Sequence, residues 1–409
     1  MPKTILLSTI GSRGDVQPLV ALAVELRKSG HHPKFCLPPN FKDWIESLGF
    51  EFAPIGIDVQ KYVTTKTSPK PADQMRQMVH ASVIDQFNVT MKAAEGCNRI
   101  VVANGVHHGG RSVAEALNIP FVFVTYCTAT LKSPSHVPPN VGMILRAPGR
   151  VQTWPKCINR LLWRISDRHS NNLFRDIVNQ QRERLDLRPV EDVPAHIATD
   201  EPWVAADALL APLPPKTTAV QTGAWILPDP RPLPDSLEKF LNEGEPPVYF
   251  GFGSMRGIES LNRSAIETAR ALGYRAVVST GWSGFQLPDN RSDCMAIDDI
   301  SFEKLFPRVA AVVHHGGAGT TTAAARSGKP QVIVPHMYDQ FYFAHRIAKL
   351  GIGVSAGNAS SCSRERLTAA LKVCLRAETR KAAESVGRRI ELNGARIAAD
   401  RLMNSLRAL

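Results

Sequence analysis

Short apolar runs alternate with stretches of helical periodicity along most of the 409-residue chain. Thr4–Ser8 has the pattern of a buried strand, and Val16–Ser29 repeats apolar residues at helical spacing before it stops at Gly30. Such alternation favours parallel sheets with helices on both faces. The other elements predicted in the first half are strands at His32–Leu37, Arg99–Ala103 and Pro120–Thr125 and a helix at Arg111–Leu117.

The pattern breaks in the middle of the chain and then restarts. Residues 128–156 are rich in Pro, Gly and basic residues, a long helix is predicted at Ile158–Leu187, and prolines crowd residues 211–235. The elements predicted after this break are strands at Pro247–Phe252, Arg275–Ser279, Val309–His314 and Gln331–Pro335, helices at Asn262–Leu272, Thr320–Ser327 and Gln340–Lys349, and a helical tail at Ser363–Leu409.

We therefore predict two doubly wound α/β domains. Ligands of such sheets bind beyond the carboxyl ends of the strands, so two such domains facing each other would form a binding cleft. The predicted divisions are an N-terminal domain at 1–215, a proline-rich linker at 216–240, a C-terminal domain at 241–385 and a C-terminal helix at 386–409.

Two of the turns that follow predicted strands combine glycine with polar residues. The first, at 11–15, reads Gly-Ser-Arg-Gly-Asp and opens a helix, whose N-terminus favours an anion. It lacks the G-x-G-x-x-G spacing and the acidic ribose ligand of a dinucleotide site. Asp15 is equally explained as the N-cap of a plain tight turn. The second, Gly-Phe-Gly-Ser-Met at 251–255, offers Ser254 to a phosphate or is simply a strand-to-helix turn.

The turn at 314–321 is the strongest candidate for a ligand site. Its sequence, His-His-Gly-Gly-Ala-Gly-Thr-Thr, brings backbone amides, a helix N-terminus and a histidine to one place. That combination predicts an anion site, most simply for a diphosphate, with a metal ligand or a structural turn as alternatives. A further turn ends in Asp339 and Gln340, whose carboxylate and amide suit sugar hydroxyls; the alternative is that Asp339 is only a helix N-cap.

These four turns together resemble those of the nucleotide-sugar-dependent GT-B glycosyltransferases, specifically the family of sterol glucosyltransferases and of macrolide and glycopeptide antibiotic glycosyltransferases. The resemblance covers nearly the whole chain and is loosest over residues 56–175. It implies the GT-B fold: two Rossmann-like domains facing across a cleft, with the C-terminal helix crossing back to the first domain. It rests on GSRGDVQPLVALAVEL at 11–26, PPVYFGFGSM at 246–255 and LFPRVAAVVHHGGAGTTTAAARSGKPQVIVPHMYDQ at 305–340.

The resemblance implies a nucleoside-diphosphate sugar as donor, held mainly by the C-terminal half. His315 is similar in position to the family's diphosphate-binding histidine, and Asp339 and Gln340 to the pair that holds the hexose hydroxyls. Ser301 lies in the segment that contacts the base, where the family often has Val-Pro-His, so this contact stays open. Trp282 is similar to a family position near the nucleotide and is equally explained as a core residue. The other donor-binding positions implied are Ser12, Gly14, Ser254, Gly316, Gly317, Gly319 and Thr320.

The resemblance implies that Asp15 occupies the position of the family's catalytic base. Plant relatives carry a His there and the sterol and antibiotic group an Asp, and either side chain can take the proton of an acceptor hydroxyl. Because no carboxylate directly follows the strand at 99–103, Asp15 is expected to act alone or with His107 or His108, which are otherwise surface or core residues. The chain contains no D-x-D, so we expect a metal-free reaction, and the family's outcome is inversion.

Composition narrows the class of protein. Hydrophobic residues make up 44% and charged residues 21%, as in globular proteins, and no apolar run approaches the ~20 residues that span a bilayer. The start of the chain lacks a signal-peptide pattern, and seven scattered cysteines without C-x-x-C argue against a disulfide framework or a zinc site. We therefore expect a cytoplasmic protein without bound metal.

The net charge of +12 is concentrated in one segment. Residues 132–176 hold eight basic and two acidic residues, together with apolar residues at helical spacing. This segment is either a peripheral contact to an anionic membrane or a solvated helix packed on the core. Nucleic acid is disfavoured, because aromatic residues make up only 7% of the chain and no recognised binding motif appears.

The sequence thus predicts an inverting, metal-independent glycosyltransferase that needs no cofactor. The expected reaction moves a hexose, glucose from UDP-glucose, to a hydroxyl of a lipophilic acceptor such as a sterol or polyketide. The alternatives are a dTDP-sugar-dependent antibiotic glycosyltransferase and a non-catalytic nucleotide-sugar- or lipid-binding relative. Asp15 favours an enzyme, because a non-catalytic relative has no need of the base.

Overall fold

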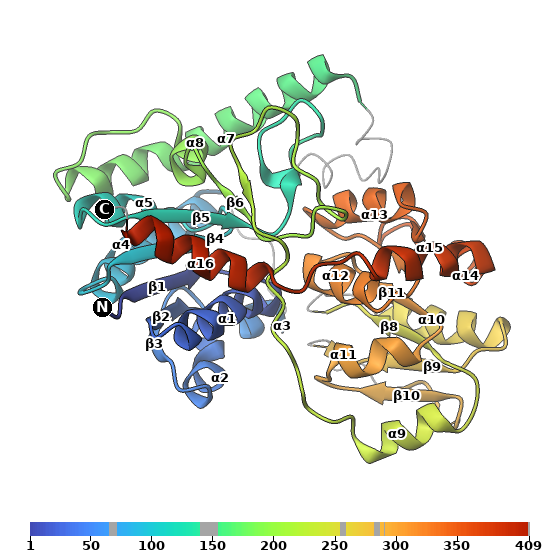
Figure 1. The fold of residues 1–409 in the computed structure, drawn as a ribbon. Coiled ribbons are helices and arrows are strands. Elements are labelled where there is room, and N and C mark those ends of the chain that lie inside the picture. The colour runs from blue at the N-terminus through green and yellow to red at the C-terminus, as the bar shows by residue number, and fades with distance from the viewer. Residues whose placement is uncertain (65–71, 140–153, 254–258, 282–286, 290, 408–409) are drawn as a thin grey trace.

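Two parallel sheets, one in each half of the chain, organise the molecule (Figure 1). The computed structural model describes residues 1–64, 72–139, 154–253, 259–281, 287–289 and 291–407. Within these residues the strand orders are β3-β2-β1-β4-β5-β6-β7 and β10-β9-β8-β11-β12-β13. The doubly wound α/β fold predicted from the alternating pattern is therefore confirmed.

The first sheet is buried on both faces, because successive side chains of a strand point to opposite sides. Ile5 and Leu7 join the core beneath α1 and α16, whereas Leu6 joins the core beneath α4, α5, α7 and α8. The strands of this domain are β1 (Thr4–Thr9), β2 (His32–Leu37), β3 (Glu51–Pro54), β4 (Arg99–Ala103), β5 (Phe121–Thr125), β6 (Trp203–Val204) and β7 (Val220–Gln221). Its helices are α1 (Arg13–Lys28), α2 (Lys42–Ser47), α3 (Val59–Thr64), α4 (Ala72–Ala93), α5 (Gly110–Ala116), α7 (Lys156–Glu183) and α8 (Val193–Ala198).

The second sheet is built in the same way. Phe250 packs against α10 and α14 on one face, and the adjacent Tyr249 packs against α9, α11 and α12 on the other. The strands are β8 (Val248–Gly251), β9 (Ala276–Ser279), β10 (Cys294–Ile297), β11 (Ala311–His314), β12 (Gln331–Ile333) and β13 (Gly353–Ser355). The helices are α9 (Asp235–Asn242), α10 (Glu259–Ala271), α11 (Phe302–Leu305), α12 (Ala318–Arg326), α13 (Gln340–Lys349), α14 (Arg364–Cys374), α15 (Ala377–Gly387) and α16 (Gly394–Arg407).

The connection between the two sheets is partly structured. The stretch at 216–240, predicted as a linker, contains the edge strand β7 of the first sheet and the start of α9. The residues between these two elements, 222–234, form neither helix nor strand. Prolines crowd this stretch, and they cannot donate to a sheet.

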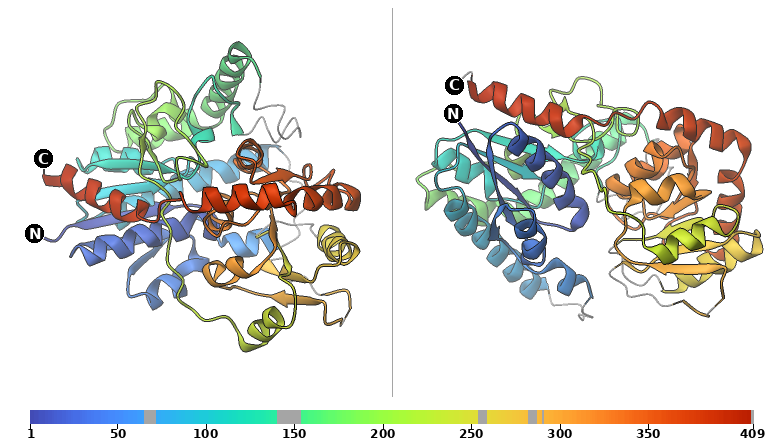
Figure 2. Two further views of the ribbon diagram at one scale, coloured as in Figure 1. Left: turned by 45° about the vertical axis from the view of Figure 1, so that its right-hand side comes forward. Right: turned by 60° about the horizontal axis from the view of Figure 1, so that its bottom comes forward.

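The two domains are held together by an apolar interface and by the C-terminal helix. Buried residues from both domains form one cluster, and the Thr128 hydroxyl of the first domain donates to the Tyr342 hydroxyl of the second at 2.9 Å. Figure 2 shows α16 crossing from the second domain to the first, where it packs on α1. Arg99 of β4 secures the crossing by donating to the Leu402 carbonyl at 3.1 Å.

Candidate active site

The turn after β1 places Asp15 at the start of α1. Ser12 is the N-cap of this helix, so Asp15 lies in its first turn and is not the N-cap itself. The Oδ2 atom of Asp15 accepts the Ser12 backbone N–H at 2.7 Å and the Ser12 hydroxyl at 3.3 Å. Burial raises the pKa of Asp15, and these hydrogen bonds partly oppose that rise. Glycine is required at position 11, because a Cβ there would collide with the Asp15 carboxylate.

Asn104, in the turn after β4, is a site residue that sequence reasoning missed. Its Nδ2 atom lies 3.2 Å from Asp15 Oδ1, and its backbone is left-handed, with φ at 64°. Tyr126, after β5, donates its hydroxyl to the Asp15 carbonyl at 2.8 Å. Three neighbouring turns of the first sheet therefore converge on one residue, Asp15, and two of them reach its carboxylate.

His107 and His108, the predicted helpers of Asp15, are core residues. The Nε2 atom of His107 lies 2.9 Å from the Ser8 hydroxyl, and the His108 ring stacks on Phe174 of α7. Burial lowers the pKa of His107 to about 3 and that of His108 to about 4. Both rings are therefore neutral, and neither has a hydrogen bond to Asp15 among the contacts of the described residues.

The two adjacent histidines at the carboxyl end of β11 differ in role. His314 is fully buried; its Nε2 lies 2.9 Å from Gln331 Oε1, and its Nδ1 accepts the Gly316 N–H at 3.1 Å. An imidazole that accepts at Nδ1 and donates at Nε2 is neutral, in agreement with its pKa, which burial lowers to about 4. His314 therefore shapes the turn and is not presented to a ligand.

His315 lies between two glycine turns of the second domain. A Cβ on Gly317 would come within 2.5 Å of its Nε2, and one on Gly253 within 3.1 Å of its Cε1. Its Nδ1 is buried and has no hydrogen-bond partner among the described residues. Burial, with His314 and His336 nearby, lowers the pKa of His315 to about 3, so the ring is an uncharged donor or acceptor.

The N-terminus of α12 completes this side of the site. Gly317 is the N-cap, and Thr321 is the first residue whose N–H bonds back to it, at 3.0 Å. The N–H groups at 318–320, which include Gly319 and Thr320, have no acceptor within the helix and suit an anion. Gly316 has φ at 93°, and a Cβ there would lie 2.7 Å from Ile333, so only glycine fits.

The turn after β12 presents Asp339 and Gln340. Gln340 is buried, and its Oε1 accepts the backbone N–H groups of His336 at 2.7 Å and Met337 at 3.1 Å. The side-chain amino group of Gln340 is then the part that can donate to a ligand. Asp339 is the N-cap of α13, as in the structural alternative, although its side chain makes no capping hydrogen bond.

The two sides of the site face each other. Burial and the charge of Asp15 raise the pKa of Asp339 to about 7. Ala318, at the start of α12, packs against the core of the first domain. Arg13, beside Asp15, forms an ion pair with Asp299 of the second domain at 2.7 Å. A carboxylate on the first domain therefore lies opposite a helix N-terminus, His315 and an Asp-Gln pair on the second.

The other predicted site residues have different surroundings. Gly14 is exposed at the start of α1, with the Ser12 hydroxyl near it. Ser301 is buried, and its hydroxyl donates to the Asp229 carbonyl at 2.8 Å in the segment that connects the domains. The Ser301 side chain is therefore not presented to a ligand. Ser254 and Trp282 lie outside the described residues.

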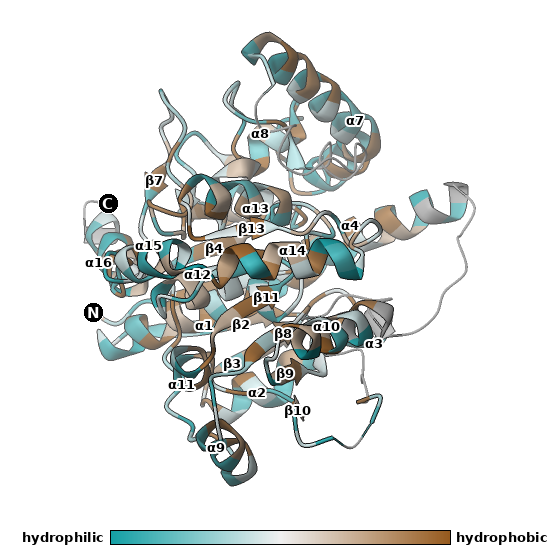
Figure 3. Cartoon of the chain, turned by 90° about the vertical axis from the view of Figure 1, so that its right-hand side faces the viewer, coloured by the Kyte–Doolittle hydropathy of each residue, from teal (hydrophilic) through white to brown (hydrophobic). Residues whose placement is uncertain are grey.

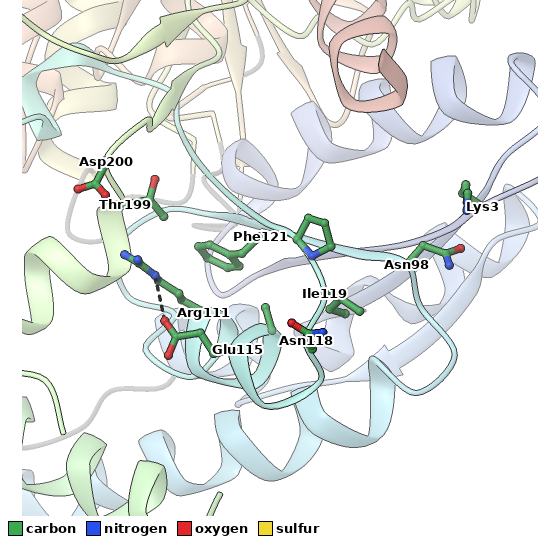
Figure 4. Close-up of a pocket in the computed structure, with 11 residues that line it drawn as sticks. Lys3, Asn98, Arg111, Glu115, Asn118, Ile119, Phe121, Thr199 and Asp200 are labelled. Carbon is green, nitrogen blue, oxygen red and sulfur yellow. Dashed lines mark ion pairs between the residues drawn. The ribbon is translucent and has the colours of Figure 1, made fainter. Parts of the chain in front are cut away.

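A hollow on the first domain lies at the other end of its sheet (Figure 4). Its lining includes Lys3, Asn98 and Phe121, at the amino ends of β1, β4 and β5. Because doubly wound sheets bind ligands at the carboxyl ends of their strands, the site between the domains is the better candidate. In the described part of the chain no cluster of three His, Cys, Asp or Glu side chains suits a metal ion.

Two family models match the chain: the glycosyltransferase family 28 N-terminal domain over residues 5–134, and the erythromycin biosynthesis protein CIII-like C-terminal domain over residues 284–392. Glycosyltransferase GtfE of Amycolatopsis orientalis is 43% identical over 97% of this chain and 96% of its own. The vancomycin aglycone glucosyltransferase of the same organism is 40% identical over 98% of this chain and 97% of its own. The dTDP-epi-vancosaminyltransferase of that organism is 37% identical over 93% of this chain and 92% of its own.

More distant proteins are similar as well. Sterol 3-beta-glucosyltransferase UGT80A2 of Arabidopsis thaliana is 28% identical over 95% of this chain and 63% of its own. The crystal structure of the kitacinnamycin glycosyltransferase superposes with a TM-score of 0.72 over 98% of this chain and 99% of its own. Because that identity is only 16%, the superposition supports the fold alone.

Proposed function

The chain belongs to the GT-B glycosyltransferases, in the family of the glycopeptide antibiotic glycosyltransferases, and from this premise we propose that it moves glucose from UDP-glucose to a hydroxyl of a lipophilic acceptor. The observation that carries the proposal is the arrangement around Asp15. Its carboxylate, held by the Ser12 N–H, belongs to the first domain, and the N-terminus of α12 in the second domain packs against that domain through Ala318 and follows directly on His315. One side can take a proton while the other stabilises a leaving diphosphate.

In the proposed reaction, the oxygen of the acceptor hydroxyl attacks the anomeric carbon while its proton passes to the Asp15 carboxylate. The bond between the anomeric carbon and the β-phosphate oxygen breaks, and UDP leaves with the bonding electrons. The N–H groups at the start of α12 and the His315 ring stabilise the developing charge. This single displacement converts an α-linked donor into a β-glycoside. No metal or cofactor enters the proposal, in keeping with the lack of D-x-D in the sequence.

Asp339 and Gln340 are proposed to hold the hexose hydroxyls, which makes donor affinity depend on pH. The pKa of Asp339 is about 7, so below this pH its carboxyl is protonated and accepts hydroxyl groups less well. Binding then selects the ionised form, lowers this pKa in the complex and releases a proton. We expect the affinity for UDP-glucose to fall by up to about tenfold per pH unit below 7, measured by calorimetry.

The control for this pH dependence is Asp339→Asn, which cannot ionise. Its affinity for UDP-glucose should be weaker than that of the wild type at neutral pH and nearly constant with pH. If the affinity for UDP-glucose changes with pH in the same way in the wild type and in Asp339→Asn, Asp339 is not the titrating group. The proposed contact of Asp339 with the hexose would then be wrong.

The donor nucleotide has one alternative, a dTDP-sugar. Glucose is favoured as the sugar because an Asp-Gln pair suits a hexose with free hydroxyls, and a relative named as a glucosyltransferase is 40% identical. The proposal takes UDP as its carrier. A relative named as a dTDP-sugar transferase is 37% identical and supports the alternative. A thermal-shift panel of nucleotide sugars decides between them, since the ligand that binds the native state more tightly raises the melting temperature more.

We also propose that residues 132–176 contact an anionic membrane peripherally. The enzyme would be cytoplasmic and would take its lipophilic acceptor from the membrane. In the described residues no helix is long and apolar enough to cross a bilayer. Helix α7 carries three exposed apolar residues at helical spacing, Ile158, Leu161 and Ile165, which are 40%, 55% and 56% exposed. Figure 3 shows that hydrophobic and hydrophilic residues are mixed along this helix. Exposed Arg160 and Arg164 lie beside the three apolar residues, a charge pattern complementary to anionic lipid.

The membrane contact predicts binding to phosphatidylglycerol-containing vesicles and not to pure phosphatidylcholine. Leu161→Ser with Ile165→Ser should weaken the binding on the order of tenfold, because two apolar side chains no longer enter the lipid. Leu392→Ser, at a 61% exposed leucine on the other domain, is the matched control and should bind as the wild type does. Sedimentation with vesicles measures this. Equal binding by all three proteins, or no binding of the wild type to phosphatidylglycerol-containing vesicles, would contradict the contact.

A further inference from the structure

In the turn after β4, both the nitrogen and the oxygen of the Asn104 side-chain amide make hydrogen bonds. The Nδ2 group lies 2.9 Å from Thr9 Oγ1, 3.0 Å from the Ile10 carbonyl and 3.2 Å from Asp15 Oδ1. The Oδ1 atom accepts the Val106 N–H at 3.3 Å. The left-handed backbone, with φ at 64°, is uncommon outside glycine and costs free energy that the surrounding contacts must offset.

We propose that Asn104 is a positioning residue that keeps the Asp15 carboxylate ionised and turned toward the acceptor. The two oxygens of Asp15 have different partners: Oδ2 is held by Ser12 and Oδ1 by Asn104. An amide is suited to this task, because it donates a hydrogen bond without adding a charge. The inference rests on the proposed function in one respect, that Asp15 is the base.

The opposite carboxylate explains why such a donor is needed. Asp15 and Asp339 repel each other across the site, so one of them tends to hold a proton. In the described residues Asp15 receives hydrogen bonds from Ser12 and Asn104, whereas Asp339 has no donor beyond its own backbone N–H. The proton therefore resides preferentially on Asp339. The remaining titratable group at this point, Tyr126, donates its hydroxyl to the Asp15 carbonyl and does not reach the carboxylate oxygens.

Two variants test the inference while preserving the left-handed turn. Asn104→Gly removes the side chain and tolerates positive φ, and Asn104→Asp keeps the shape but replaces the donor by a second carboxylate. We expect the acid limb of the kcat–pH profile to move to higher pH by about one unit in Asn104→Gly and further in Asn104→Asp. At neutral pH kcat should also fall about tenfold or more, because the carboxylate is no longer turned toward the acceptor hydroxyl, with the Kd for UDP unchanged.

The outcomes separate this inference from the proposed function. If both variants keep the wild-type pH profile, or lose kcat equally at every pH together with affinity for UDP, Asn104 is only a structural turn residue and the inference is overturned. Asp15→Asn, measured beside them, reports on the base itself. If that variant is inactive while the Asn104 profiles are unmoved, the proposed function stands and only the role of Asn104 fails.

Discussion

Asp15→Asn is expected to lower kcat by roughly 10²- to 10⁴-fold, the usual contribution of a general base. The amide is the same size as the carboxylate, and its oxygen can still accept the Ser12 N–H that caps α1. It cannot take a proton from the acceptor hydroxyl. Steady-state rates of UDP release with a lipophilic acceptor measure the loss, and titration with UDP should show nearly unchanged donor affinity.

The matched control is Asp85→Asn. Asp85 also accepts a backbone N–H, that of Gly56 at 3.2 Å, within the same domain but outside the site. This variant makes the same chemical change and should keep turnover near that of the wild type. Wild-type turnover in Asp15→Asn would remove Asp15 as the base, and an equal loss in both variants would indicate damage to the fold.

His315→Ala is expected to weaken binding of UDP by about 10- to 100-fold, the range for a lost hydrogen bond to a charged group. The ring lies against Gly253 and Gly317, in the two turns that meet at the proposed diphosphate site. Turnover should fall as well, because the same contact stabilises the leaving group. Calorimetric titration with UDP gives the affinity, and kcat at saturating donor gives the second effect.

His169→Ala, at an exposed histidine of α7, is the control for the loss of an imidazole. It should bind UDP as the wild type does. If His315→Ala also binds UDP normally while it remains folded, the diphosphate does not contact this ring and the assignment of the turn after β11 fails. A shift in melting temperature without a change in affinity would assign His315 a structural role.

The fold and the family were predictable from local pattern. The buried strands are continuous apolar runs bounded by turn residues. The segment at 305–340 contains glycines at positions where the structure leaves no room for a side chain. Gly316 requires a positive φ, and Gly317 must leave room for the His315 ring. The local sequence does not show that the environments of His314 and His315 differ. His314 is buried beside Gln331 of the next strand, a contact between residues 17 positions apart.

The contacts missed were those between residues far apart in the chain. Asn104 reaches Asp15 over 89 positions, and the sequence around it showed only the lack of a carboxylate. Closeness in sequence to that turn suggests His107 and His108 as helpers of Asp15, but in the structure α4 and α7 cover them. Ser301 stays a prediction for the contact to the base, and its hydroxyl donates to the Asp229 carbonyl in the segment that connects the domains.

The central claim is that the second domain binds the donor while Asp15 on the first domain carries the chemistry. The most direct test is calorimetric titration of folded Asp15→Asn with UDP-glucose in excess chelator. We predict a Kd within a few-fold of that of the wild type, together with strongly reduced transfer. A folded Asp15→Asn protein that binds neither UDP-glucose nor a dTDP-sugar under these conditions, or that binds only when Mg²⁺ is restored, would contradict the account.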